Sequence, residues 1–87
     1  MFFNPNKTAI KALKKELKEL HAKSALYRKN ITRLENAIAY YSGKEYHENN
    51  ASMVEILYIE KDSLWEAMAE TNRLIGVKSS RLVELQK

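Results

Sequence analysis

Two histidines and the acidic residues near them are the side chains of this chain that could bind a metal or transfer a proton. Carboxylate-bridged metal bundles place a Glu three residues before each metal-binding His, but a Lys occupies that position before both His21 and His47. His47 lies between Glu45 and Glu48 in a polar stretch, which is more typical of a solvated loop than of a metal site. The chain also contains no Cys and therefore no thiolate ligand. We expect no metal site.

Other catalytic signatures are missing from the sequence as well. It contains no Gly-rich phosphate loop, no Ser nucleophile elbow and no Cys nucleophile. A nucleophile without a neighbouring base has no means of activation. We therefore expect a protein that is not an enzyme, with no cofactor and no small-molecule substrate.

Lysines provide a second kind of chemistry, the binding of polyanions. Five of them recur at helical spacing on one outward stripe: Lys7, Lys11, Lys14, Lys15 and Lys18. Such a stripe can follow a phosphate backbone and gain affinity by releasing counterions, and Arg81 at the same basic end is a further candidate. Residues that read bases are sparse along it, so a solvated helix face is the simpler interpretation and nucleic-acid binding the alternative.

Charge is unevenly distributed along the chain. Residues 1–29 and 71–87 together hold twelve basic and three acidic residues, whereas residues 30–70 hold three basic and eight acidic ones. The outer segments thus carry +9 and the middle segment −5, in agreement with the net charge of +4. A chain folded at its middle would be basic at the open end and acidic near the turn.

The first half of the chain contains a regular heptad pattern. Apolar or aromatic residues occupy nine of ten positions spaced alternately by three and four, with Ser24 as the exception: Ile10, Leu13, Leu17, Leu20, Ser24, Tyr27, Ile31, Leu34, Ile38 and Tyr41. Alternating steps of three and four keep one stripe of a helix against a neighbouring helix. This stretch therefore predicts a long helix packed along a narrow seam.

The second half repeats the pattern less regularly, at Val54, Leu57, Lys61, Leu64, Met68, Thr71, Ile75, Lys78, Leu82 and Leu85. Folding the chain back so that paired residue numbers sum to 95 fills every layer of the seam and places Ser24 opposite Thr71. A small polar layer can satisfy its own hydrogen bonds, which favours this register. Lys61 and Lys78 would pack their stems on the seam and extend their ammonium groups to water.

These patterns predict an all-α protein, a long antiparallel helical hairpin of the coiled-coil kind in a single domain over residues 1–87. We expect one helix over about 6–42, capped by Asn4 or Asn6 and ended by Gly43 in a left-handed conformation. A polar connection over 43–51 leads to a second helix over about 52–86, started by a Ser52–Glu55 capping box. Gly76 in that helix is either tolerated or the site of a kink or close helix contact.

Several large apolar residues near the turn have no place in the seam. The predicted interface consists of Tyr40, Met53, Ile56, Tyr58, Ile59 and Trp65, and Tyr46 in the connection is a further candidate. Soluble monomers rarely expose such residues together. We expect the hairpin to form a homodimer, a four-helix bundle, and treat a patch reserved for an unknown protein as the alternative.

The sequence thus favours a protein–protein interaction module, such as an adaptor, assembly factor or inhibitor, with nucleic-acid binding through the lysine stripe as the alternative. The first residues lack the basic start and apolar run of a secretion signal, and no segment reaches about 18 uninterrupted apolar residues. We therefore expect a cytoplasmic protein without a membrane partner. The layout resembles that of the small plasmid RNA-binding protein that dimerises into a four-helix bundle, and of ribosomal helical hairpins, in architecture and charge only.

Overall fold

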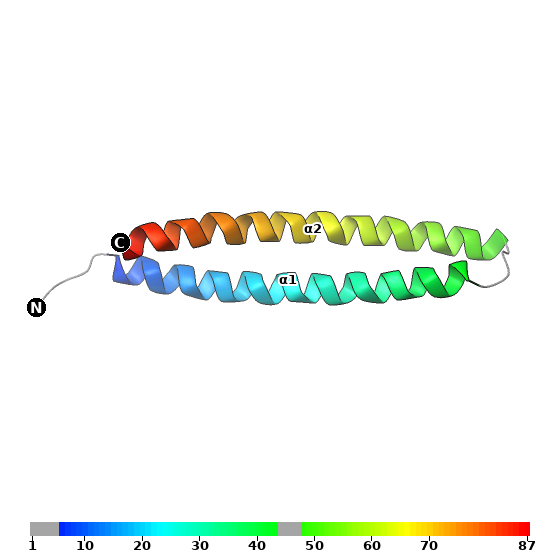
Figure 1. The fold of residues 1–87 in the computed structure, drawn as a ribbon, viewed down its shortest axis with the longest axis horizontal. Helices are drawn as coiled ribbons and strands as arrows, with labels where there is room; N and C mark the ends of the chain where they lie inside the picture. The colour runs from blue at the N-terminus through cyan, green and yellow to red at the C-terminus, as the bar shows by residue number, and fades with distance from the viewer. Residues whose placement is uncertain (1–5, 44–47) are drawn as a thin grey trace, which may run out of the picture.

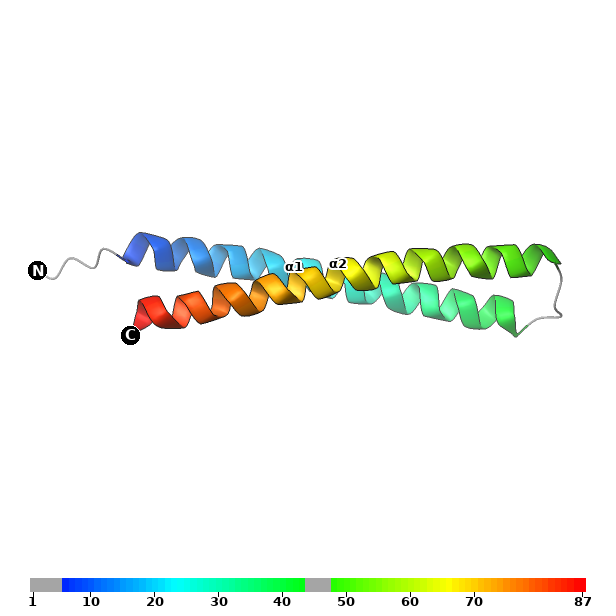
Figure 2. The same cartoon turned by 90° about the horizontal axis from the view of Figure 1, so that it is seen from above.

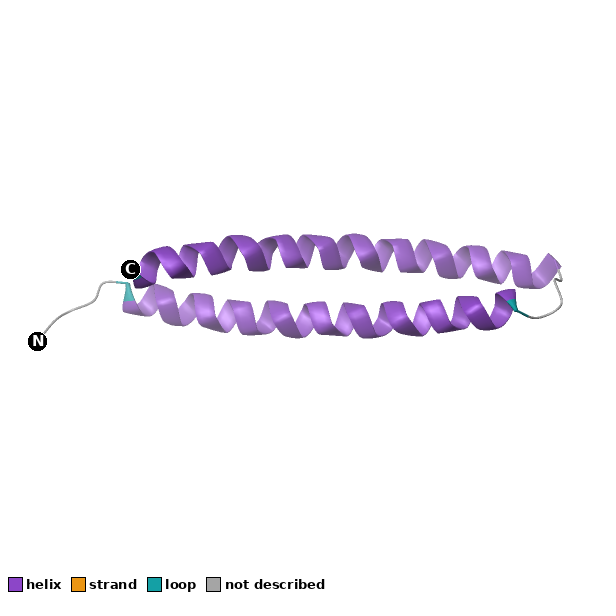
Figure 3. Cartoon of the chain, viewed as in Figure 1, coloured by secondary structure: helices purple, strands orange, loops and turns teal. Residues whose placement is uncertain are grey.

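Two long antiparallel helices, packed side by side, make up the protein (Figure 1). The computed structural model describes residues 6–43 and 48–87. Helix α1 spans Lys7–Ser42 and helix α2 spans Glu48–Gln86. They form a rod about 58 Å long, set by the 39 residues of α2, and all regular secondary structure of the described residues is helical (Figure 3). The all-α hairpin expected from the sequence is confirmed.

A single seam of apolar side chains joins the two helices. The buried apolar residues are Leu13, Leu17, Ile31 and Ile38 from α1 and Met68 from α2, and all five belong to the predicted heptads. The remaining predicted seam residues are half-buried, apart from Thr71, which is buried. Figure 2 shows the helices crossing near the middle of the rod. Such wrapping is expected of two helices that keep a seven-residue repeat in contact.

Contacts between the helices agree with the predicted register. The Ser24 hydroxyl donates to Oδ1 of Asn72 over 2.7 Å, and the Lys78 ammonium donates to Oε2 of Glu16 over 2.8 Å. The residue numbers in these two pairs sum to 96 and 94, one on each side of 95. The two helices are therefore aligned as the heptads predict.

The polar layer in the middle of the seam satisfies its own hydrogen bonds. Thr71 is buried, and its hydroxyl donates to the carbonyl of Ala67 over 2.9 Å. Ser24 bonds to Asn72, the neighbour of Thr71, instead of to Thr71 itself. No buried side-chain nitrogen or oxygen among the described residues lacks a partner. The layer is therefore accommodated without an unpaired group, which would be costly in a low-dielectric seam.

The predicted start of the second helix was wrong by one turn. Helix α2 begins at Glu48, so Ser52 and Glu55 lie inside the helix and do not form a capping box at its start. The added turn packs against the end of α1, because Asn50 and Ala51 are half-buried and line a recess of about 180 Å³ together with Tyr41. The helix thus begins before the local start signal, where its first turn lies beside the end of α1, and tertiary surroundings often override such signals.

The predicted left-handed conformation at Gly43 was also wrong. Gly43 has φ −84° and ψ −9°, a right-handed conformation, and its N–H donates to the Ala39 carbonyl over 3.0 Å. The helical hydrogen bonding simply continues to this residue, so no left-handed cap is needed. Asn6 precedes α1 but makes no side-chain capping hydrogen bond. Asn4, the other candidate cap, lies outside the described residues.

Gly76 is tolerated within an unbroken helix. Helix α2 continues through this position, and a Cβ placed there would meet no atom within 4 Å. The alternative of a close helix contact is therefore excluded for the hairpin itself. Glycine costs about 1 kcal/mol relative to alanine in such a position.

Candidate protein-interaction surface

The six side chains predicted to form an interface are all exposed on the folded hairpin. Their exposed fractions are 56% for Tyr40, 44% for Met53, 57% for Ile56, 47% for Tyr58, 63% for Ile59 and 46% for Trp65. Each lies outside the seam, so packing of α1 on α2 leaves it in solvent. Tyr46, the further candidate, lies outside the described residues.

Helical position assigns Tyr58 and Trp65 to one face of the rod. Tyr58, Trp65 and Asn72 are spaced by seven residues, so they lie on the same side of α2. The hydrogen bond from Ser24 to Asn72 marks this flank of the seam. We call it the tryptophan face.

Met53 and Ile56 lie on the opposite face. Met53 precedes Tyr58 by five residues, which is a rotation of about 140° around the helix, and Ile56 adjoins Met53. The ion pair between Lys78 and Glu16 marks this flank, where both residues line a recess with Glu19, Leu20 and Lys23.

Tyr40 follows Glu19 by three heptads and therefore lies on the same side of the rod as Glu19, Met53 and Ile56. We call this side the methionine face. Ile59 points from the outer edge of α2, between the two faces. The predicted interface residues thus share one half of the rod but are divided between two faces.

Two of the exposed rings have neighbours in their own helix. The ammonium of Lys61 lies 5.7 Å from the centre of the Tyr58 ring, and the rings of Tyr40 and Tyr41 meet edge to face at 5.2 Å. Lys61 is half-buried, in keeping with a stem that packs at the seam. Lys78, by contrast, does not simply extend to water, because it pairs with Glu16. Contacts of this kind at exposed sites are each worth on the order of 0.5–1 kcal/mol.

All five lysines of the predicted stripe are exposed, and none forms an ion pair within the described part of the chain. Lys14 directly follows the seam residue Leu13, as Tyr58 follows the seam residue Leu57, so the stripe lies on the tryptophan face at the open end. Arg81 is also exposed, but it directly precedes the seam residue Leu82 and lies on the methionine face. The structure therefore separates Arg81 from the five lysines.

Two exposed aliphatic residues were missed at the open end. Val77 and Val83 are each 55% exposed and lie on α2, on the methionine and tryptophan faces respectively. Their position outside the heptad was the signal that could have identified them. Leu26, also exposed, shares the methionine face with Tyr40, because the two are separated by two heptads. Five of the nine exposed large hydrophobic residues thus lie on the methionine face: Leu26, Tyr40, Met53, Ile56 and Val77.

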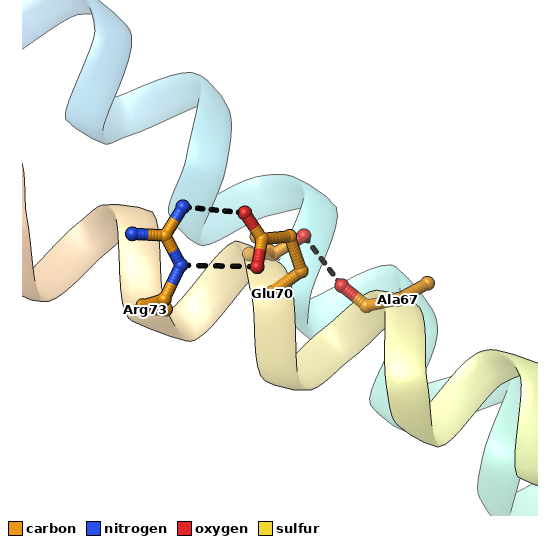
Figure 4. A network of polar contacts seen from close by, with 4 residues as sticks. Ala67, Glu70 and Arg73 are labelled. Carbon is orange, nitrogen blue, oxygen red and sulfur yellow. Dashed lines mark hydrogen bonds and ion pairs between the residues drawn. The ribbon is translucent and has the colours of Figure 1, made fainter.

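Electrostatic contacts on the surface are local. The Arg73 guanidinium donates to both oxygens of Glu70, over 2.6 and 3.0 Å, from one turn further along α2 (Figure 4). These hydrogen bonds, together with the charge of Arg73, hold the pKa of Glu70 below its ordinary value, and Glu70 in turn raises the pKa of Arg73. Both groups are exposed, so the pair contributes little to stability.

Neither a metal cluster nor a membrane-spanning helix occurs among the described residues. No group of three or more His, Cys, Asp or Glu side chains gathers there in a way that could hold a metal ion. Neither described helix is apolar over a long enough stretch to cross a bilayer. His47, the histidine with acidic neighbours in the sequence, lies outside the described residues.

Comparison of the chain with protein-family models, with curated proteins and with solved structures finds no match.

Proposed function

We propose that this chain is a non-enzymatic protein–protein interaction module that associates with a second copy to form a four-helix bundle. The observation that supports the proposal is the exposure of all six predicted interface side chains on a hairpin whose seam is already filled. Water-exposed aliphatic and aromatic groups gain free energy when a partner removes them from solvent. Because they occupy two faces, the rod can contact two partners, which is the geometry of an adaptor.

The surface area of the hairpin also favours association. The chain exposes 7053 Å², whereas a compact monomer of 10.1 kDa exposes about 5,300 Å². A two-helix rod cannot enclose its side chains on all sides, since each helix has only one neighbour. Packing two rods together would provide the second layer that a small helical protein needs.

Sedimentation equilibrium of the purified protein at tens of micromolar tests this proposal. We expect a mass above that of the monomer, and a fall in association for at least one of two matched variants. Met53→Gln/Ile56→Gln changes the methionine face, and Tyr58→Gln/Trp65→Gln changes the tryptophan face. Circular dichroism should show that both variants keep their helices. A wild-type monomer would refute the proposal, as would full association of both variants.

The alternative function is nucleic-acid binding by the lysine stripe. It is supported by five exposed lysines, four of them on the tryptophan face and Lys15 at the outer edge of α1, none of which forms an ion pair within the described residues. Their span on α1, from Lys7 to Lys18, is about 16 Å, enough to lie along several phosphates. Binding to a short generic RNA or DNA duplex should then be measurable at about 50 mM salt and weaken steeply as salt rises. Absence of binding at low salt would eliminate this alternative.

A further inference from the structure

The methionine face has the size and character of an interface between two copies of this chain. It runs the length of a rod about 58 Å long, from the 39 residues of α2, and 14 Å wide, which gives on the order of 800 Å² per copy and 1,600 Å² in a dimer. Stable specific interfaces bury about 1,200–2,000 Å² in total. Five of the nine exposed large hydrophobic residues lie on it, in both halves of the rod. The tryptophan face, by comparison, carries most of the lysine stripe.

The charge of the rod indicates how a second copy would be oriented. Residues of the open end carry +9 and residues near the turn carry −5. A parallel dimer would bring the two basic ends together and the two acidic halves together. An antiparallel dimer instead places each basic end beside the acidic half of the other copy, which attraction between opposite charges favours.

We propose that the hairpin forms an antiparallel homodimer through its methionine face, with Glu60 of each copy paired to Arg81 of the other. This inference rests on the self-association proposed above. A two-fold interface must be self-complementary, so that if residue i contacts residue j of the second copy, residue j contacts residue i. The positions of the residues on α1 and α2 allow that requirement to be checked.

Aligning the two α1 helices end to end sets one antiparallel register, and aligning the two α2 helices, residues 48 and 86, sets another one heptad away. The first register is the one that brings Glu60 opposite Arg81, and we adopt it because opposite charges then meet. The ends of α1, residues 7 and 42, sum to 49, so a residue of α1 lies opposite the residue of the second α1 that completes this sum. Within one hairpin, each residue of α1 lies beside the α2 residue that brings the sum of their numbers to 95. Two α2 residues that face each other across the dimer therefore have numbers that sum to twice 95 less 49, which is 141. Glu60 and Arg81 complete that sum, and their spacing of three heptads places both on the methionine face. Both are exposed, and neither forms an ion pair within the described part of its own chain.

Two apolar pairs of the methionine face meet under the same rotation, whereas Met53 lies beyond the end of the second α2 at Gln86 and Leu26 lies opposite Lys23. Leu74 lies opposite Ala67 of the second copy, and Tyr40 lies opposite Ala9, so that large side chains meet small ones. Leu74 and Ala67 are already half-buried in the hairpin, because each lies next to a seam residue on the side of the methionine face. Large side chains set against small ones are what a well-packed bundle core requires.

Charge reversal tests the pairing of Glu60 with Arg81. We expect Glu60→Lys and Arg81→Glu each to weaken dimerisation at least about tenfold. The two-fold dimer contains the Glu60–Arg81 pair twice, and either substitution removes both pairs. The combined variant E60K/R81E should restore association, because the reversed charges again face each other. Asp62→Lys is the matched control, with the same change in net charge on the tryptophan face, and should leave association within about threefold of wild type.

Engineered cysteines test the orientation, since the chain contains none of its own. Ser52 and Ser80 are both exposed on the outer edge of α2, 28 residues or about 42 Å apart. One sample pairs a donor-labelled Ser52→Cys copy with an acceptor-labelled Ser80→Cys copy, and the other pairs two labelled Ser52→Cys copies. In the antiparallel dimer, energy transfer is stronger in the first sample, because residue 52 of one copy lies closer to residue 80 of the other than to its residue 52. A parallel dimer gives the reverse order.

The outcomes separate this inference from the proposed function. Rescue by E60K/R81E with stronger transfer between Ser52 and Ser80 supports the antiparallel dimer. A dimer in which the combined variant is not rescued, or in which same-site transfer is stronger, overturns the inference and leaves self-association intact. A wild-type monomer overturns both proposals.

Discussion

The division between seam and surface can be tested with the same substitution at two isoleucines. Ile31 is 3% exposed and Ile59 is 63% exposed, so Ile→Ala removes the same three carbons from a packed site in one case and from solvent in the other. At Ile31 the lost burial is worth about 2.4 kcal/mol at about 0.8 kcal/mol per carbon, and the cavity raises the loss to about 3 kcal/mol. At Ile59 we expect a change below about 0.5 kcal/mol, because alanine's higher helix propensity offsets the small loss of contact.

Urea unfolding followed by circular dichroism measures both changes, at a protein concentration low enough that only the hairpin contributes. With an m value of roughly 1–1.5 kcal/mol/M, Ile31→Ala should lower the urea midpoint by about 2–3 M and Ile59→Ala should barely move it. Equal losses in the two variants would show that Ile59 is packed in the isolated chain, and would contradict the assignment of the seam. An unchanged urea midpoint for Ile31→Ala would also contradict the assignment of the seam, because it would show that Ile31 is not packed there.

Three further substitutions are informative. Gly76→Ala should raise the free energy of unfolding by about 1 kcal/mol and the thermal midpoint by roughly 4–8 °C, since alanine favours the helix and meets no neighbour. Glu16→Gln should cost below about 1 kcal/mol in urea unfolding, and the cost should shrink in high salt, since the pair with Lys78 is partly exposed. The Glu70 pKa is lowered in the folded state, so its small contribution to stability is present above the unfolded pKa and lost as pH falls through the folded one. Glu70→Gln should therefore have its effect on thermal unfolding at neutral pH and none at strongly acidic pH.

The seam could be predicted from the sequence because it depends on a repeat of residue types. Heptad spacing gave the two helices, their antiparallel register and the meeting of Ser24 with the Thr71 layer, and the structure confirms each. The start of α2 could not be predicted in the same way. Its first turn is polar in sequence and lies beside the end of α1, where Asn50 and Ala51 line a recess together with Tyr41. No local signal at Ser52 reports this arrangement.

The candidate site could be predicted residue by residue but not as a surface. Exposure of the six predicted interface residues follows directly from their absence from the heptads, and the structure confirms this exposure. Their division between two faces depends on which flank of the seam each residue lies on. The hydrogen bonds from Ser24 and from Lys78 across the two helices identify these two flanks. The same bonds separate Arg81 from the lysine stripe, although both belong to the basic end in sequence.

Folding and the proposed self-association draw on different residues, and salt should therefore affect them differently. The seam of the hairpin is apolar, and among the described residues one ion pair, Lys78 with Glu16, joins the two helices, so salt should change unfolding of the isolated chain little. Association of antiparallel copies places the +9 end of each beside the −5 half of the other. Added salt screens that attraction while leaving apolar burial intact. An interface governed by burial alone would keep its affinity at high salt, whereas the antiparallel dimer should weaken under conditions in which the hairpin remains folded.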